Sequence, residues 1–112
     1  MDQKNIEKKI GELQILESNL QQLIAQKQAF QIELNEITNA LSELSQSDGD
    51  VYQIILGVMV KSDKKRVVKD LEEKKRVANL RISSLEKQEE TLSAKTTALR
   101  KEVTGAVSKR NE

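Results

Sequence analysis

The sequence has 112 residues, which is room for one ordinary domain. Charged residues make up 33% and aromatic residues 2%, and Pro, Cys and Trp are absent, so the composition suits exposed helix and excludes disulfides and thiolate chemistry. The 19 Lys and Arg nearly balance the 18 Asp and Glu, so no overall field favours nucleic acid or an anionic membrane. Without an apolar signal core or membrane span, we expect a soluble, cytoplasmic protein.

The first predicted element is a long helix over about residues 3–45. Its apolar residues recur in alternating steps of three and four, which is the spacing of a coiled-coil seam. Ten of the twelve seam positions are apolar, and the remaining positions are mostly Gln, Glu, Lys, Ser and Asn. The seam consists of Ile6, Lys9, Leu13, Leu16, Leu20, Leu23, Lys27, Phe30, Leu34, Ile37, Leu41 and Leu44.

The next segment, residues 45–62, loses the heptad and predicts a β-hairpin over about residues 51–61. It opens with the turn-forming residues 45–50, and two runs rich in β-branched residues follow, separated by Gly57, which can supply a positive φ. We expect this hairpin to mediate oligomerisation, because an isolated two-stranded ribbon is barely stable. The predicted oligomerisation residues are Val51, Tyr52, Ile54, Val58, Met59 and Val60.

The pairing within this hairpin follows from the position of its turn. A turn at residues 55–57 places Ile54 opposite Val58 and Tyr52 opposite Val60. These four side chains would then form one apolar face.

A second long helix is predicted over about residues 63–110. Ser62 or Asp63 is a suitable N-cap, because a short side-chain oxygen can accept from the free N–H groups of the first turn. Nine of the twelve positions of its seam are apolar. This second seam consists of Val68, Leu71, Lys75, Ala78, Ile82, Leu85, Glu89, Leu92, Thr96, Leu99, Val103 and Ala106.

The two seams are equally long and predict an antiparallel coiled coil. Leu44 would face Val68 and Leu13 would face Leu99, so that each a position meets a d position. The polar seam positions Lys9, Lys27, Lys75, Glu89 and Thr96 have two interpretations: they fix the register, or they let the arms separate. We also expect four apolar residues outside the seams to be exposed, namely Ile10, Ile15, Ile24 and Val107.

A family resemblance rests on the run Val51-Tyr52-Gln53-Ile54-Ile55-Leu56-Gly57-Val58-Met59-Val60-Lys61, followed by Asp63-Lys64 and later by Leu85-Glu86-Lys87-Gln88-Glu89. Placed between two equal heptad arms, these residues resemble the β-type, archaeal-like subunit of prefoldin, which has a single hairpin. Family members commonly place Gly before Pro or Asn at the turn, where this chain has Leu56-Gly57, and Gln53 stands where Lys is frequent.

The resemblance implies a single prefoldin-like domain over residues 1–112 and a heterohexamer of two α-type and four β-type subunits. The hairpins would join an oligomeric β-barrel body at the closed end of each coiled coil. The complex would be an ATP-independent holdase that captures unfolded polypeptides at the distal tips and delivers them to a group II chaperonin. The expected client-binding tip residues are Ile6, Ile10, Leu13, Val103, Ala106 and Val107.

Other function classes find little support. Without His or Cys and with Ser and carboxylates on long helices, no catalytic residue is expected, and neither a metal site nor a phosphate-binding Gly loop is apparent, so we expect no cofactor. The basic cluster at Lys61, Lys64, Lys65, Arg66 and Lys69 lacks aromatic neighbours for stacking on bases, so no nucleic acid is expected. The main alternative is a non-chaperone coiled-coil scaffold or tether that dimerises with itself.

Overall fold

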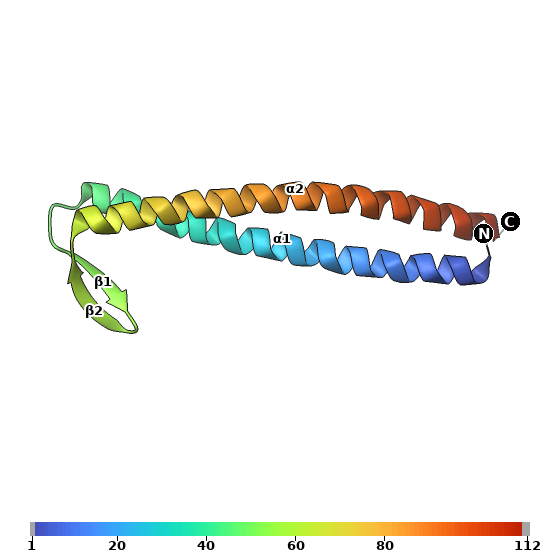
Figure 1. The fold of residues 1–112 in the computed structure, drawn as a ribbon, viewed down its shortest axis with the longest axis horizontal. Coiled ribbons are helices and arrows are strands. Elements are labelled where there is room, and N and C mark those ends of the chain that lie inside the picture. Colours follow the sequence, from blue (N-terminus) through green and yellow to red (C-terminus); the bar gives the residue numbers. More distant parts are fainter. Residues whose placement is uncertain (1, 111–112) are drawn as a thin grey trace. The chain divides into compact units, whose positions relative to one another are not determined.

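The computed structural model describes residues 2–110, and the predicted bounds at residues 1, 111 and 112 lie outside them. Its elements follow in the order α1 (Gln3–Gln46), β1 (Val51–Ile55), β2 (Val58–Ser62) and α2 (Lys64–Arg110), as Figure 1 shows. The predicted fold class, mainly α with two long helices joined by a β-hairpin, is confirmed.

A hydrogen bond in the first turn marks where each helix begins. The Asp2 carboxylate accepts a hydrogen bond from the backbone N–H of Asn5 at 2.9 Å, which caps the first turn of α1. α1 ends where the turn-forming segment from Ser47 begins. At the start of α2, the N–H of Val67 donates to the carbonyl of Asp63 at 3.0 Å, so the helix begins directly after Asp63, as expected.

The chain forms two compact units, Met1–Lys27 with Ser83–Glu112, and Gln28–Ile82. We call the first the arm-end unit and the second the hairpin unit. Within the arm-end unit, residue numbers on α1 rise as those on α2 fall from one ion pair to the next, so the two helices are antiparallel. These ion pairs are Lys9–Glu102, Glu17–Arg100 (2.9 Å) and Lys27–Glu89 (2.7 Å).

The core of each unit is a single seam. Every predicted seam position on both helices is buried or half-buried, whereas most other helical positions are exposed. The pair of Lys9 with Glu102, the neighbour of Val103, also agrees with the predicted register. The most buried apolar side chains are Ile6, Leu85 and Val103 in the arm-end unit, and Ile37, Val67 and Ala78 in the hairpin unit; all except Val67 are predicted seam positions.

The hairpin differs from its prediction by one residue. Its strands pair with Ile55 opposite Val58 and Ile54 opposite Met59, so the predicted pairing of Ile54 with Val58 and of Tyr52 with Val60 is wrong. The reason is a tight two-residue turn in which Leu56 and Gly57 have φ values of 50° and 81°. Positive φ at both central residues is typical of a type I′ turn, whose twist matches that of the flanking strands.

This register divides the hairpin into two apolar faces instead of one, because a shift of one residue moves a side chain to the other face. The Tyr52 face consists of Tyr52, Ile54, Met59 and Lys61. The Val60 face consists of Val51, Gln53, Ile55, Val58, Val60 and Ser62. The three half-buried residues of the hairpin, Val51, Gln53 and Ser62, all belong to the Val60 face, so the Tyr52 face is the fully exposed one.

The turn gives a first testable prediction. An ordinary L residue at positive φ costs roughly 1–2 kcal/mol, and the side chain of Leu56 is 99% exposed and packs on nothing that could offset this cost. Replacing Leu56 by Asn should therefore stabilise the hairpin by about 1 kcal/mol, measured as slower amide hydrogen exchange in β1 and β2. Gly57→Ala is the matched control and should speed exchange, because no atom blocks its new Cβ and only the φ is unfavourable. Unchanged exchange in both variants would contradict the strain argument.

Candidate functional site

Exposed apolar side chains gather in the hairpin. Of the large apolar residues with high exposure, most lie in β1, β2 and their turn, including Ile54 at 74% and Met59 at 67%. The remaining ones are Ile15 in the arm-end unit and Ile32, Val77 and Leu80 in the hairpin unit. Such a concentration on one small element is typical of an interaction surface.

The hairpin is also held at its base. The Lys64 ammonium donates to the backbone carbonyl of Ser47 at 2.6 Å, and Lys61 lies 3.7 Å from the carboxylate of Asp50. Among the described residues the sheet has only β1 and β2, so each strand keeps one edge whose backbone groups are free to pair with another chain. The hairpin therefore offers two apolar faces and two open edges on an anchored base.

Two of the six predicted tip residues lie in the core of the arm-end unit, and the other four are partly exposed. Ile6 is 2% exposed and Val103 is 9% exposed, while Ile10, Leu13, Ala106 and Val107 are half-buried. Ile6 and Val103 would therefore contact a client only if the helices separated, whereas the four half-buried residues keep part of their surface exposed. Client binding at these residues stays a prediction.

The expectation that four apolar residues outside the seams are exposed holds only for Ile15, at 62%. Ile10, Ile24 and Val107 are half-buried. They flank the seam, and an apolar stripe on a packed helix is wider than the strict a and d positions.

Three of the five polar seam residues, Lys27, Glu89 and Thr96, are hydrogen-bonded to one another or to the backbone. Lys27 donates to Glu89 at 2.7 Å, and this hydrogen bond raises the pKa of Lys27 above its ordinary value. Thr96 is 2% exposed, and its hydroxyl donates to the carbonyl of Leu92 at 2.8 Å. The bond between Lys27 and Glu89 joins the two helices and favours the register-fixing interpretation of these two residues, whereas the bond of Thr96 lies within α2 and only satisfies its buried hydroxyl. The pair was missed at the sequence level, although opposite charges in neighbouring seam layers could have indicated it.

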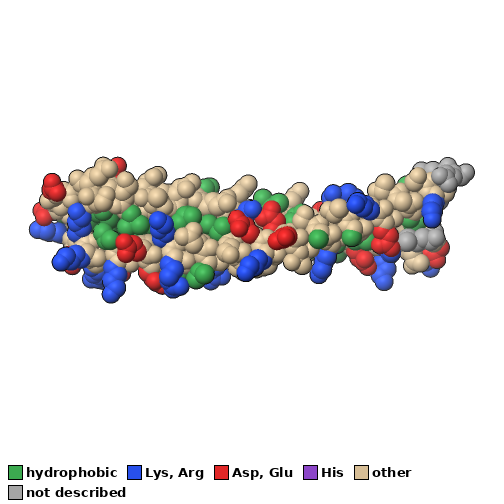
Figure 2. Space-filling view, turned by 90° about the horizontal axis from the view of Figure 1, so that it is seen from above, with side chains coloured by type: hydrophobic (Ala, Val, Ile, Leu, Met, Phe, Trp, Pro, Cys, Tyr) green, Lys and Arg blue, Asp and Glu red, His purple; other side chains and the backbone are tan. Residues whose placement is uncertain are grey.

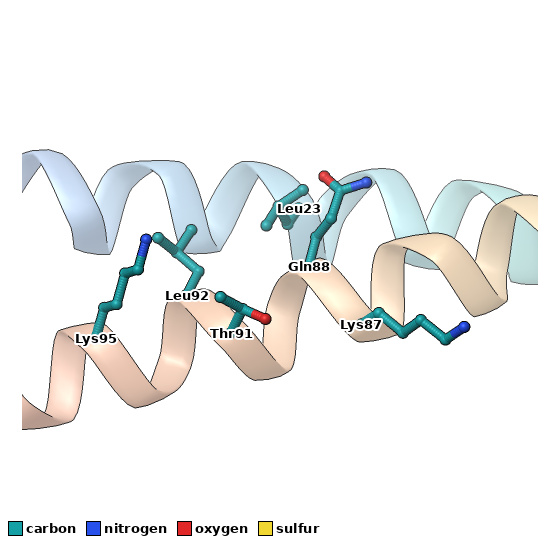
Figure 3. A pocket seen from close by; sticks show the side chains of 6 residues that line it. All are labelled: Leu23, Lys87, Gln88, Thr91, Leu92 and Lys95. Atoms are coloured by element: carbon teal, nitrogen blue, oxygen red, sulfur yellow. The ribbon is translucent and has the colours of Figure 1, made fainter.

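An open groove of about 370 Å³ lies beside the seam in the arm-end unit. Leu23 reaches it from α1, and the other lining residues come from α2, as Figure 3 shows. Lys and Arg side chains mix with Asp and Glu side chains over the face seen in Figure 2, with apolar side chains between them. Within residues 2–110 no group of three or more acidic side chains could hold a metal ion. Over the same residues, neither helix is apolar enough to traverse a membrane.

Comparison with known proteins gives consistent matches over nearly the whole chain. Residues 7–110 match the family model described as prefoldin subunit. The chain is 33% identical to the prefoldin subunit beta of Sulfurisphaera tokodaii over 106 residues, which cover 93% of this chain and 85% of that protein. It is 31% identical to the prefoldin subunit beta of Pyrococcus horikoshii over 100 residues, covering 88% and 86% of the two chains.

Solved structures of similar fold agree with these sequence matches. The crystal structure of the prefoldin beta subunit from Thermococcus strain KS-1 superposes with a TM-score of 0.81, at 32% identity and with 91% of each chain covered. The prefoldin beta2 subunit from the same strain has a TM-score of 0.71 at 19% identity, covering 80% of this chain and 97% of that one, which supports the fold alone.

Proposed function

Because this chain belongs to the prefoldin subunit family, we propose that it is a β-type subunit of an ATP-independent holding chaperone. The observation that carries the proposal is an exposed apolar hairpin between two antiparallel coiled-coil arms. Identity of 31–33% to beta subunits over most of the chain supports the β type. A single hairpin fits this type as well.

We infer that the hairpin joins those of neighbouring subunits in a β-barrel body. Two α-type subunits and four copies of this chain would complete the complex. The free edges of β1 and β2 and the exposed Tyr52 face support this arrangement, because both features are costly to leave uncovered.

In this proposal residues 1–112 act as one prefoldin-like domain in the cytoplasm. The arm ends, with Ile6, Ile10 and Leu13 beside Val103, Ala106 and Val107, hold unfolded polypeptides and pass them to a group II chaperonin. The burial of Ile6 and Val103 adds a condition, since the helices must separate there before these side chains meet a client. Neither catalysis nor a cofactor is needed, because capture depends on apolar contact alone.

The test is suppression of aggregation by the reconstituted complex. The chain is mixed with an α-type prefoldin subunit, the complex is isolated by size, and light scattering follows a chemically unfolded protein diluted into it. We expect suppression that is the same with and without ATP, and weaker suppression by either subunit alone because several arms must act together. A requirement for ATP, or the absence of both a mixed complex and suppression, would contradict the proposal. A homodimer that ignores the α-type subunit would favour the scaffold alternative.

A further inference from the structure

The groove beside the seam combines an apolar floor with a cationic rim. Leu23 and Leu92 lie on its two helices, and Thr91 and Gln88 line it between two lysines. In Figure 3, Lys95 extends alongside Leu92 while Lys87 extends away at the opposite end, so the two ammonium groups bracket the leucines. All six lining residues belong to the arm-end unit.

The charge around this groove is one-sided. Lys87 and Lys95 are exposed, and neither takes part in an ion pair within the described residues. On α1, residues 18–32 contain no Asp or Glu. On α2, Glu89 is engaged by Lys27, while Glu86 and Glu90 do not line the groove. The lining therefore carries two lysines that form no ion pair within the described residues, and it carries no carboxylate.

The spacing of the two lysines fits an extended peptide. Eight residues of helix separate them, which is roughly 12 Å along the axis at 1.5 Å per residue. Four residues of extended chain span about 13 Å, and residues i, i+2 and i+4 of such a chain project on the same side. Two carboxylates at i and i+4 can thus reach the two ammonium groups while an apolar side chain at i+2 enters the space between Leu23 and Leu92.

We propose that this groove binds extended segments of unfolded clients that carry an apolar residue flanked two positions away on each side by Asp or Glu. The inference rests on the proposed holding function and deepens it by naming a class of client segment. Each exposed charge contact contributes only about 0.2–1 kcal/mol, so a single groove binds weakly and reversibly. Several grooves in one complex would act together on a long client.

The experiment titrates peptides into the isotope-labelled full-length chain and follows amide chemical shifts. The probe is a Gly- and Ser-flanked peptide with the core Glu-Ser-Leu-Ser-Glu, compared with Lys-Ser-Leu-Ser-Lys and Glu-Ser-Ser-Ser-Glu. We expect the first peptide to shift the amides of Leu23, Thr91 and Leu92, with affinity about five- to tenfold above that of either comparator.

The variant Lys87→Gln/Lys95→Gln should abolish this preference, while its fold is kept because both positions are exposed and Gln is a good helix former. The control Lys101→Gln/Lys109→Gln removes two exposed lysines at the same spacing on α2 and should leave the preference intact. The proposal would be overturned if the peptide did not bind or if its affinity did not depend on peptide charge. It would also be overturned if the chemical-shift changes were confined to the arm tips or the hairpin, or if both variants had equal effects. Aggregation suppression by the complex is measured separately, so the groove can fail while the holding function stands.

Discussion

A chain with Ile54→Asp should fail to assemble with its partner subunits, while its two helices form as before. Ile54 is 74% exposed and stands opposite Met59 at the centre of the Tyr52 face, which nothing in the hairpin unit covers. Assembly would bury the new carboxylate without a partner, at a cost of several kcal/mol. Size measurement of the mixed subunits should show separate species, and the helical circular dichroism of the variant alone should be unchanged.

Two matched variants test whether the loss of assembly is due to a charge on the Tyr52 face. Ile54→Val keeps an apolar β-branched side chain and should assemble normally. Val60→Asp places the same charge on the opposite face of the hairpin, where Val51, Gln53 and Ser62 are already half-buried, and should impair assembly less. Full assembly of the Ile54→Asp chain would exclude the Tyr52 face from the interface, and loss only with Val60→Asp would move the interface to the other face.

The helices were predictable from the sequence because their pattern is redundant. Twelve seam positions on each helix repeat the same spacing, so a polar residue such as Lys27 or Thr96 leaves the phase unchanged. The start of α2 was equally predictable, because Asp63 is a strong N-cap directly before a long periodic run. Many independent residues thus support each of these conclusions.

The hairpin register was not predictable in the same way. It depends on one turn, and the sequence suggested a three-residue turn, because Leu is a poor residue for the positive φ that a two-residue type I′ turn requires at Leu56. Pairing in the strands then overrode the local preference of one residue. An error of a single position changes which side chains share a face, and for this reason the prediction of one shared apolar face was wrong although the hairpin was right.

The candidate site was predicted only in part. Apolar tip residues are visible in a sequence, but whether Ile6 or Val103 is exposed depends on how closely two helices pack at their ends. The groove at Leu23 and Leu92 was missed, because both leucines count as ordinary seam residues and the free lysines beside them resemble any solvated helix face. Only the structure shows which charges are paired and which are free.

Deletion of the arm ends is expected to have a large effect on client holding. Removing residues 1–12 together with 100–112 should leave assembly intact and lower the capacity to hold clients by about tenfold or more, since client binding is multivalent. The deletion takes away the seam layers of Ile6 and Val103, whereas the hairpin unit, Gln28–Ile82, is untouched. Complex formation is measured by size and holding by light scattering. Full suppression by a correctly assembled, shortened complex would place the client site elsewhere, either in the groove lined by Leu23 and Leu92, which the deletion retains, or on the body.

A covalent cross-link between the two helices at the arm ends tests whether clients bind only when the helices separate, because it removes no apolar surface. Lys9 and Glu102 form an ion pair across the two helices, and the chain has no cysteine of its own, so Lys9→Cys/Glu102→Cys introduces a single pair of thiols that a short, reducible bifunctional thiol reagent can bridge. If clients reach Ile6 and Val103 only when the helices part, the cross-linked variant should lose most of its holding capacity and regain it when the cross-link is reduced. Holding that is unchanged by the cross-link would mean that clients use surface available on closed arms, either the half-buried residues Ile10 and Val107 or the groove lined by Leu23 and Leu92. The burial of Ile6 and Val103 favours the first outcome, because a closed seam offers a client little of either side chain.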